Sequence, residues 1–149
     1  MDIGVYCIHP MVLLFGKPRQ VMASGIFLPN HMEGAGTVLM DYGSMLGEVR
    51  YSKITDSAQP SEIQGEDANM LIWQIQDTRK IQVTYRGGRQ ETFEIQKEDN
   101  NMYYEVQRMM ELTQQDGGRE LGAAHLEGSV MEMEVMDEVR RLTGIRFGD

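Results

Sequence analysis

The chain has 149 residues, of which 41% are hydrophobic and 25% charged, a composition typical of one folded domain that buries its own core. Its formal net charge of −9 disfavours nucleic acid and anionic membranes as partners, because like charges repel. The single cysteine, Cys7, excludes an internal disulfide, and no apolar run approaches a membrane span or a signal peptide, so we expect a cytoplasmic protein.

The first residues predict a helix over 2–15. Apolar side chains recur there at helical spacing, at Val5, Ile8, Val12 and Phe15. Gly16, followed by Pro18, is a typical helix stop. Pro10 has no backbone N–H to donate and crowds the carbonyl of Tyr6, so we expect a kink there or a helix in two parts.

The middle of the chain predicts about six strands. Tyr42-Gly43-Ser44 is a plausible hairpin turn, and Gly87-Gly88 suits a two-residue hairpin because both glycines can adopt positive φ. Hairpins of this kind build a mostly antiparallel sheet. The runs that predict strands are 20–28, 36–41, 45–54, 62–64, 69–76, 79–86 and 89–96.

The end of the chain predicts two helices. The first follows a cap at Asp99 or Asn100 and ends near Gln114. The second begins either at Leu126, where its apolar period starts, or at Ser129, which forms a possible capping box with Glu132.

This order of elements predicts an α+β fold and a single domain over 1–149. We expect a mostly antiparallel open sheet of about six strands, with the N-terminal helix and the two C-terminal helices on one face. Several strands carry apolar side chains toward both faces, so the open face predicts a homodimer interface. Polar alternation at Gln82, Thr84, Thr92 and Glu94 favours the alternative of a solvated outer face.

An acid, a glycine and a phenol stand at fixed offsets at the start of the first helix: Asp2, Gly4 and Tyr6. Asp2 and Tyr6 are four residues apart and share one helix face, where a carboxylate and a phenol can position and protonate a substrate oxygen. The alternatives are an N-cap role for Asp2 and a solvent-facing boundary role for Tyr6. His9 either lines the same pocket or packs against Pro10.

Three segments resemble the C-terminal domain of the glucose–fructose oxidoreductase/inositol dehydrogenase/MocA family. They are Asp2-Ile3-Gly4-Val5-Tyr6, then 62–67 leading into Met70-Leu71-Ile72, and 133–141. Members of this family are two-domain oxidoreductases whose N-terminal Rossmann domain holds NAD or NADP and supplies a lysine from a Glu-Lys-Pro motif. The chain contains neither that motif nor Gly-x-Gly-x-x-Gly after a strand. We therefore expect the Rossmann domain to be a missing partner and Met1 to be internal to a longer polypeptide.

The resemblance implies roles for the residues at the start of the helix. Tyr6 and Asp2 would be catalytic: Tyr6 would move a proton at the carbinol or carbonyl oxygen, and Asp2 would bind a substrate hydroxyl and orient Tyr6. His9 would join them in binding substrate. Gly4 would let the backbone approach a ligand or the nicotinamide, with helix packing as the alternative. His31 and His125 lack ligand partners at suitable spacing, so we expect no metal site.

The implied function is the substrate-binding and assembly half of an NAD(P)-dependent oxidoreductase that acts on a sugar, polyol or related hydroxy compound. We expect the isolated chain to bind no cofactor and to be inactive. The alternative is a stand-alone interaction or scaffold module without catalysis. The coding sequence upstream of Met1 discriminates between the two, because the enzyme requires a Rossmann fingerprint and a Glu-Lys-Pro motif there.

Overall fold

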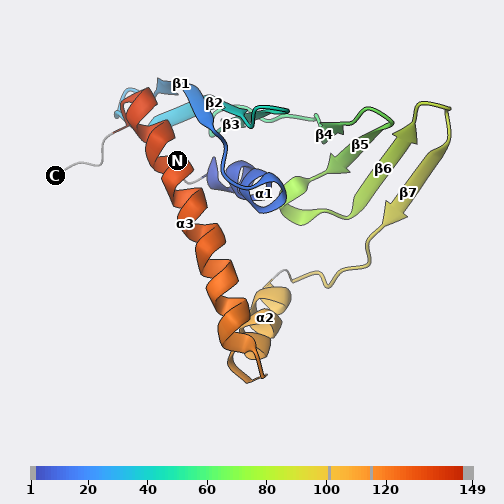
Figure 1. Cartoon of the computed structure of the whole chain (residues 1–149). Coiled ribbons are helices and arrows are strands. Elements are labelled where there is room, and N and C mark those ends of the chain that lie inside the picture. Colours follow the sequence, from blue (N-terminus) through green and yellow to red (C-terminus); the bar gives the residue numbers. More distant parts are fainter. Residues whose placement is uncertain (1–2, 101, 115, 146–149) are drawn as a thin grey trace. The chain divides into compact units, whose positions relative to one another are not determined.

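A computed structural model describes residues 3–100, 102–114 and 116–145. Figure 1 shows the order of elements along the chain. The described elements are α1 (Val5–Phe15), β1 (Gln20–Phe27), β2 (Glu33–Asp41), β3 (Leu46–Ser52), β4 (Ser61–Gln64), β5 (Ala68–Trp73), the 3₁₀ turn η1 (Ile75–Asp77), β6 (Lys80–Tyr85), β7 (Gln90–Glu94), α2 (Met102–Gln114) and α3 (Gly118–Thr143). They divide into two compact units, one made of 1–56 with 120–149 and the other of 57–119.

The first unit contains a three-stranded antiparallel sheet in the order β1-β2-β3. Side chains alternate between the faces along β3, where Val49 and Tyr51 are buried while Glu48 and Arg50 are exposed. Helices α1 and α3 cover the buried face (Figure 1). The core that they form with β2 and β3 consists of Ile8, Val12, Val38, Met40, Val49, Tyr51, Val135, Met136 and Val139.

A buried polar pair lies inside this sheet. The Tyr51 hydroxyl donates a short hydrogen bond to the Glu33 carboxylate, and both residues are buried. Gly36 stands directly opposite Tyr51 in the register, and a Cβ on Gly36 would collide with the tyrosine ring and hydroxyl. Burial, reinforced by the hydrogen bond to Glu33, raises the pKa of Tyr51 well above its usual range. Because Gly36 has no side chain, the Tyr51 ring fits against it. Burial at this position favours the neutral form of the phenol.

The second unit contains a four-stranded antiparallel sheet in the order β4-β5-β6-β7. The register places apolar side chains together on one face, and it places Gln82, Thr92 and Thr84 on the other. Among the described residues of this unit, Ile72 is the only buried hydrophobic one, and α2 buries none of its own. The apolar face carries Ile63, Met70, Ile72, Ile81, Val83 and Phe93.

The structure confirms the predicted α+β class and antiparallel pairing, and it places the strands in two sheets rather than one. Helix α1 runs as one helix through Pro10, so the alternative of a helix in two parts is wrong, and a kink at Pro10 stays a prediction. Helix α3 begins at Gly118, well before Ser129. The β6–β7 connection spans 86–89, and of its two glycines only Gly88 has positive φ, so the predicted two-residue hairpin is wrong in length. One domain over 1–149 stays a prediction.

None of the helices in the described ranges is both long enough and apolar enough to cross a membrane.

Replacement of Ile8 by Ala should lower the free energy of unfolding by about 2–5 kcal/mol, because its side chain is fully buried and truncation leaves a cavity. Leu13→Ala on the same helix is the matched control: Leu13 is 68% exposed, and its loss should change stability by about 0.5 kcal/mol or less. Urea denaturation followed by circular dichroism measures both. Equal effects of the two substitutions would contradict the assigned core.

Candidate functional site

Tyr6 lies on the first turn of α1 with its side chain in solvent. The helix is held by its opposite side, where Ile8 and Val12 are 0% and 3% exposed, whereas Tyr6 is 62% exposed. The Tyr6 amide donates a hydrogen bond of 3.2 Å to the carbonyl of Ile3, which starts the helical turn. The buried side of α1 therefore directs the phenol outward, where a ligand can reach it.

The other two residues of the Asp-x-Gly-x-Tyr string are less informative. Asp2 lies outside the described residues, so its pairing with Tyr6 stays a prediction. Gly4 is buried and stands at the N-cap position with a φ of −59°, a conformation that any residue adopts. Its backbone angle does not require glycine, and close approach of a ligand to Gly4 also stays a prediction.

His9 is joined to α3 by a polar contact that the sequence did not reveal. Its Nδ1 lies 2.7 Å from Oε2 of Glu132, and the two side chains are 51% and 9% exposed. This contact gives His9 a defined orientation on the exposed side of α1. Substrate binding by His9 stays a prediction.

Glu132 is the functional candidate that sequence reasoning missed. It stands on the buried stripe of α3, three, four and seven residues before Val135, Met136 and Val139. An acidic residue on the apolar stripe of a helix is the sequence signal that could have identified Glu132. The interpretation of Glu132 as part of a capping box with Ser129 directed attention away from it. In the structure Ser129 is inside the helix, and its hydroxyl donates to the carbonyl of His125 at 3.1 Å.

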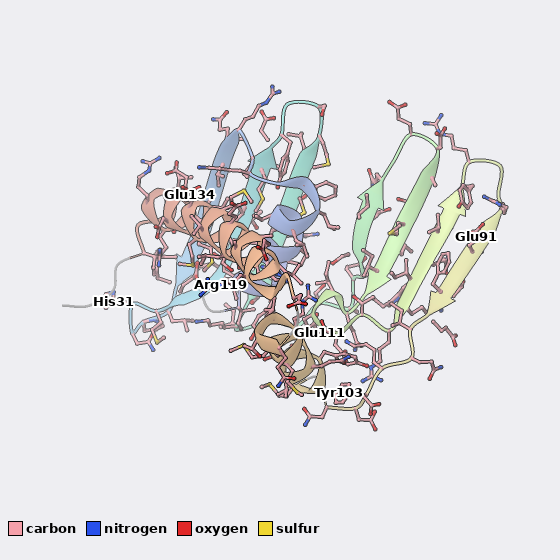
Figure 2. All side chains as sticks on the ribbon, turned by 60° about the horizontal axis from the view of Figure 1, so that its bottom comes forward. His31, Glu91, Tyr103, Glu111, Arg119 and Glu134 are labelled. Atoms are coloured by element: carbon pink, nitrogen blue, oxygen red, sulfur yellow. The ribbon has the colours of Figure 1, made fainter. Side chains whose placement is uncertain are left out.

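A second ion pair also links the segment after α1 to α3. Lys17, just after α1, lies 2.7 Å from Glu134 of α3, with side chains 55% and 50% exposed. Figure 2 labels Glu134 on α3. Exposed pairs of this kind contribute about 0–1 kcal/mol, so this one provides a useful comparison for the buried Glu132 contact.

Cys7 is not a candidate nucleophile. It is partly buried on α1, and its Sγ lies 3.9 Å from the carbonyl oxygen of Arg50. Burial raises the pKa of the thiol, which reduces the thiolate fraction that reactivity needs. Partial burial and the raised pKa therefore favour an inert thiol at Cys7.

Within the described ranges, no group of three or more His, Cys, Asp or Glu side chains is arranged to hold a metal ion. The most concentrated set of charges in the second unit surrounds Asp77, which contacts Lys97 at 2.5 Å and Arg79 at 3.2 Å. The hydrogen bond from Lys97, and then that from Arg79, lowers the pKa of Asp77. This cluster satisfies its own charges, and we interpret it as structural.

No protein-family model matches the chain. It is 37% identical over 147 residues to scyllo-inositol 2-dehydrogenase (NADP(+)) IolU of Bacillus subtilis strain 168, and 33% identical over 147 residues to the uncharacterized oxidoreductase YgjR of Escherichia coli K12. The chain belongs to the glucose–fructose oxidoreductase/inositol dehydrogenase/MocA family. The matches include 99% of the chain but only 44% of each relative, so the chain corresponds to the C-terminal half of these family members.

Solved structures of the same fold extend this comparison. The UDP-N-acetylglucosamine 3-dehydrogenase GnnA from Acidithiobacillus ferrooxidans matches with a TM-score of 0.72 at 16% identity, over 96% of this chain and 46% of that one. At this identity the match shows the fold alone. The chain therefore has the fold of the matching part of that structure.

Proposed function

We propose that this chain is the substrate-binding and assembly half of an NAD(P)-dependent oxidoreductase that acts on a sugar, polyol or related hydroxy compound. The exposure of Tyr6 on a helix anchored by its opposite side carries the proposal, because it presents a phenol at the position where the family motif has its proton-transferring residue. The Bacillus relative, named as an NADP(+)-dependent inositol dehydrogenase, supports the choice of a polyol and of a nicotinamide cofactor. The lone cysteine supports a cytoplasmic location.

The proposed chemistry divides between two halves of one enzyme. Tyr6 hydrogen-bonds the carbinol oxygen and moves its proton, while Asp2 and His9 bind neighbouring hydroxyls. The nicotinamide cofactor, when bound, exchanges a hydride with the carbinol carbon. The described residues include no glycine-rich turn between a strand and a helix that would hold its pyrophosphate, so the other half of the enzyme would bind it.

A scaffold module without catalysis is the second candidate. The apolar face of the β4–β7 sheet favours it, since that face would serve assembly whether or not Tyr6 reacts. Activity measurements separate the candidates.

Tyr6→Phe should lower the turnover number by about a hundredfold or more, because it removes a positioned proton donor and retains the ring. The measurement uses a hybrid in which the N-terminal half of the Bacillus relative precedes this chain, assayed with NADP⁺ and scyllo-inositol, other polyols and hexoses. Asp2→Asn in the same hybrid should mainly raise the KM.

Tyr103→Phe is the matched control for Tyr6→Phe. Tyr103 is 52% exposed on α2 and stands in the other unit, so loss of its hydroxyl should leave turnover unchanged. Near-normal turnover of Tyr6→Phe would contradict the catalytic assignment. A folded hybrid that binds NADP⁺ and oxidises none of these substrates would favour the scaffold module.

The isolated chain should bind neither NAD(H) nor NADP(H) in the micromolar range. The anion site that a Rossmann helix N-terminus normally supplies is missing from its sequence, and its net charge of −9 repels the phosphates. Calorimetric titration of the purified chain checks this. A dissociation constant near micromolar for either cofactor would contradict it.

Homodimerisation is the assembly function that we propose for the apolar face of the β4–β7 sheet. Among the described residues, the hydrophobic core cluster includes none from this sheet. On the apolar face Phe93 is 50% exposed, Ile72 is buried and the other four apolar side chains are half-buried. An apolar patch of this kind is unusual on a soluble monomer. A two-fold contact between two copies is the simplest closed arrangement that covers it.

The chain should therefore be a dimer at tens of micromolar, as measured by analytical ultracentrifugation. Phe93→Glu places a charge on the apolar face of β7, where Phe93 is 50% exposed, and should give a monomer. Thr92→Glu, on the opposite face of the same strand, should leave the dimer intact. A monomeric wild-type chain, or equal effects of both substitutions, would overturn the proposed interface.

A further inference from the structure

The contact between α1 and α3 places a carboxylate–imidazole pair beside Tyr6. His9 follows Tyr6 by three residues on α1, and residues at this spacing are neighbours on the helix surface, with about 5–6 Å between their Cβ atoms. Both residues are exposed to solvent. This spacing places the phenol and the ring on neighbouring positions of one face of α1.

Glu132 determines which nitrogen of His9 faces this space. The residue is 7% exposed, and its Oε2 contacts Nδ1 of His9 at 2.7 Å. Its Oε1 is also buried and has no hydrogen-bond partner among the described residues. An ionised carboxylate only accepts hydrogen bonds, so an ionised Glu132 in this contact would place the proton of the ring on Nδ1. In the neutral ring, Nε2 is then the unprotonated nitrogen, and it can accept a proton.

We propose that His9 and Glu132 form a proton relay for Tyr6, an inference that rests on the proposed oxidoreductase function. During oxidation the carbinol proton moves to the Tyr6 oxygen as the Tyr6 hydroxyl proton moves to Nε2 of His9. A bound nicotinamide would accept the hydride from the carbon–hydrogen bond of the carbinol, so the product would be a carbonyl compound and Tyr6 would remain neutral. The imidazolium is stabilised by Glu132 and releases its proton to water from the exposed edge of the ring.

In this arrangement His9 and Glu132 are positioning residues that act through Tyr6. The Lys17–Glu134 pair joins the same parts of the molecule at the same 2.7 Å distance and lies in solvent, without a titrating ring near Tyr6. A purely structural contact would make Glu132, which is buried, more important for stability than the exposed Glu134 and would give neither of them a part in turnover. Of the two glutamates, only Glu132 takes part in the proposed relay.

The first test uses the chain itself. Long-range ¹H–¹⁵N correlation spectra of the His9 ring should show the Nδ1–H form in the wild type and in Glu134→Gln. Glu132→Leu should lose this fixed form and retain wild-type or higher stability, because an aliphatic side chain replaces a buried charge on the core stripe. An Nε2–H ring in the wild type, or an Nδ1–H ring that persists in Glu132→Leu, would overturn the relay.

The second test measures turnover in the hybrid with the Bacillus N-terminal half. His9→Ala and Glu132→Leu should each lower the turnover number by about tenfold or more, Glu132→Leu should leave the KM within about twofold, and added imidazole should restore part of the His9→Ala activity. Glu134→Gln should match the wild type. If Tyr6→Phe abolishes turnover while His9→Ala and Glu132→Leu retain it, the relay is wrong and the proposed function stands. If Tyr6→Phe retains turnover, the proposed function itself fails.

Discussion

The packing of Ile8 and Val12 against the β1–β3 sheet and α3 is the interaction on which the arrangement of the first unit depends. Ile8 is fully buried and Val12 nearly so, and full burial of such a side chain stabilises a fold by about 1.5–3 kcal/mol. Helical geometry then determines the positions of the other side chains of α1. With Ile8 inside, Tyr6 and His9 must lie on the solvent side, so the core of this unit also determines the position of the candidate site.

The same packing explains how a carboxylate is tolerated on the buried stripe of α3. Burial of an ionised group is costly unless a partner of suitable charge and geometry compensates for it. One carboxylate oxygen of Glu132 contacts the imidazole of His9 on α1, while the other has no hydrogen-bond partner among the described residues. The polar contact and the apolar contacts of Val135 and Val139 lie on one stripe of α3, so this helix supports both the core and the proposed site.

Local patterns predicted most of the fold because they depend on neighbours in sequence. The alternation in β1 and β3, the helical spacing before Gly16 and the glycines near residue 88 each produced an element close to its observed position. The errors have a different physical origin. Pro10 is accommodated because the buried stripe on both sides of it holds α1 together, and Gly118 begins a helix ahead of any apolar period. Packing accounts for the first case, whereas residues 119–130 of α3 are mostly exposed, so packing of that segment does not account for the early start of the helix.

In the candidate site too, local features were predictable from the sequence and long-range contacts were not. Tyr6 is recognisable from a five-residue motif, whereas the His9–Glu132 contact joins residues 123 positions apart. No periodicity relates two such positions, and a single sequence contains no record of which side chains meet across a fold. A charged residue on an otherwise apolar stripe was the only trace that Glu132 left in the sequence. The separation of the strands into two sheets was equally hidden, because each strand alone satisfies the same alternating pattern.

The scarcity of buried apolar residues in the second unit has a thermodynamic consequence. With Ile72 as the only buried hydrophobic residue among those described there, this unit gains little from its own interior. In the proposed dimer, association would add to the stability of this unit, because the bound state is favoured by mass action. The melting behaviour of this unit would vary with protein concentration, while that of the first unit would not. The stability of the first unit would then come from its own core, and that of the second unit would depend in part on contacts with another copy of the chain.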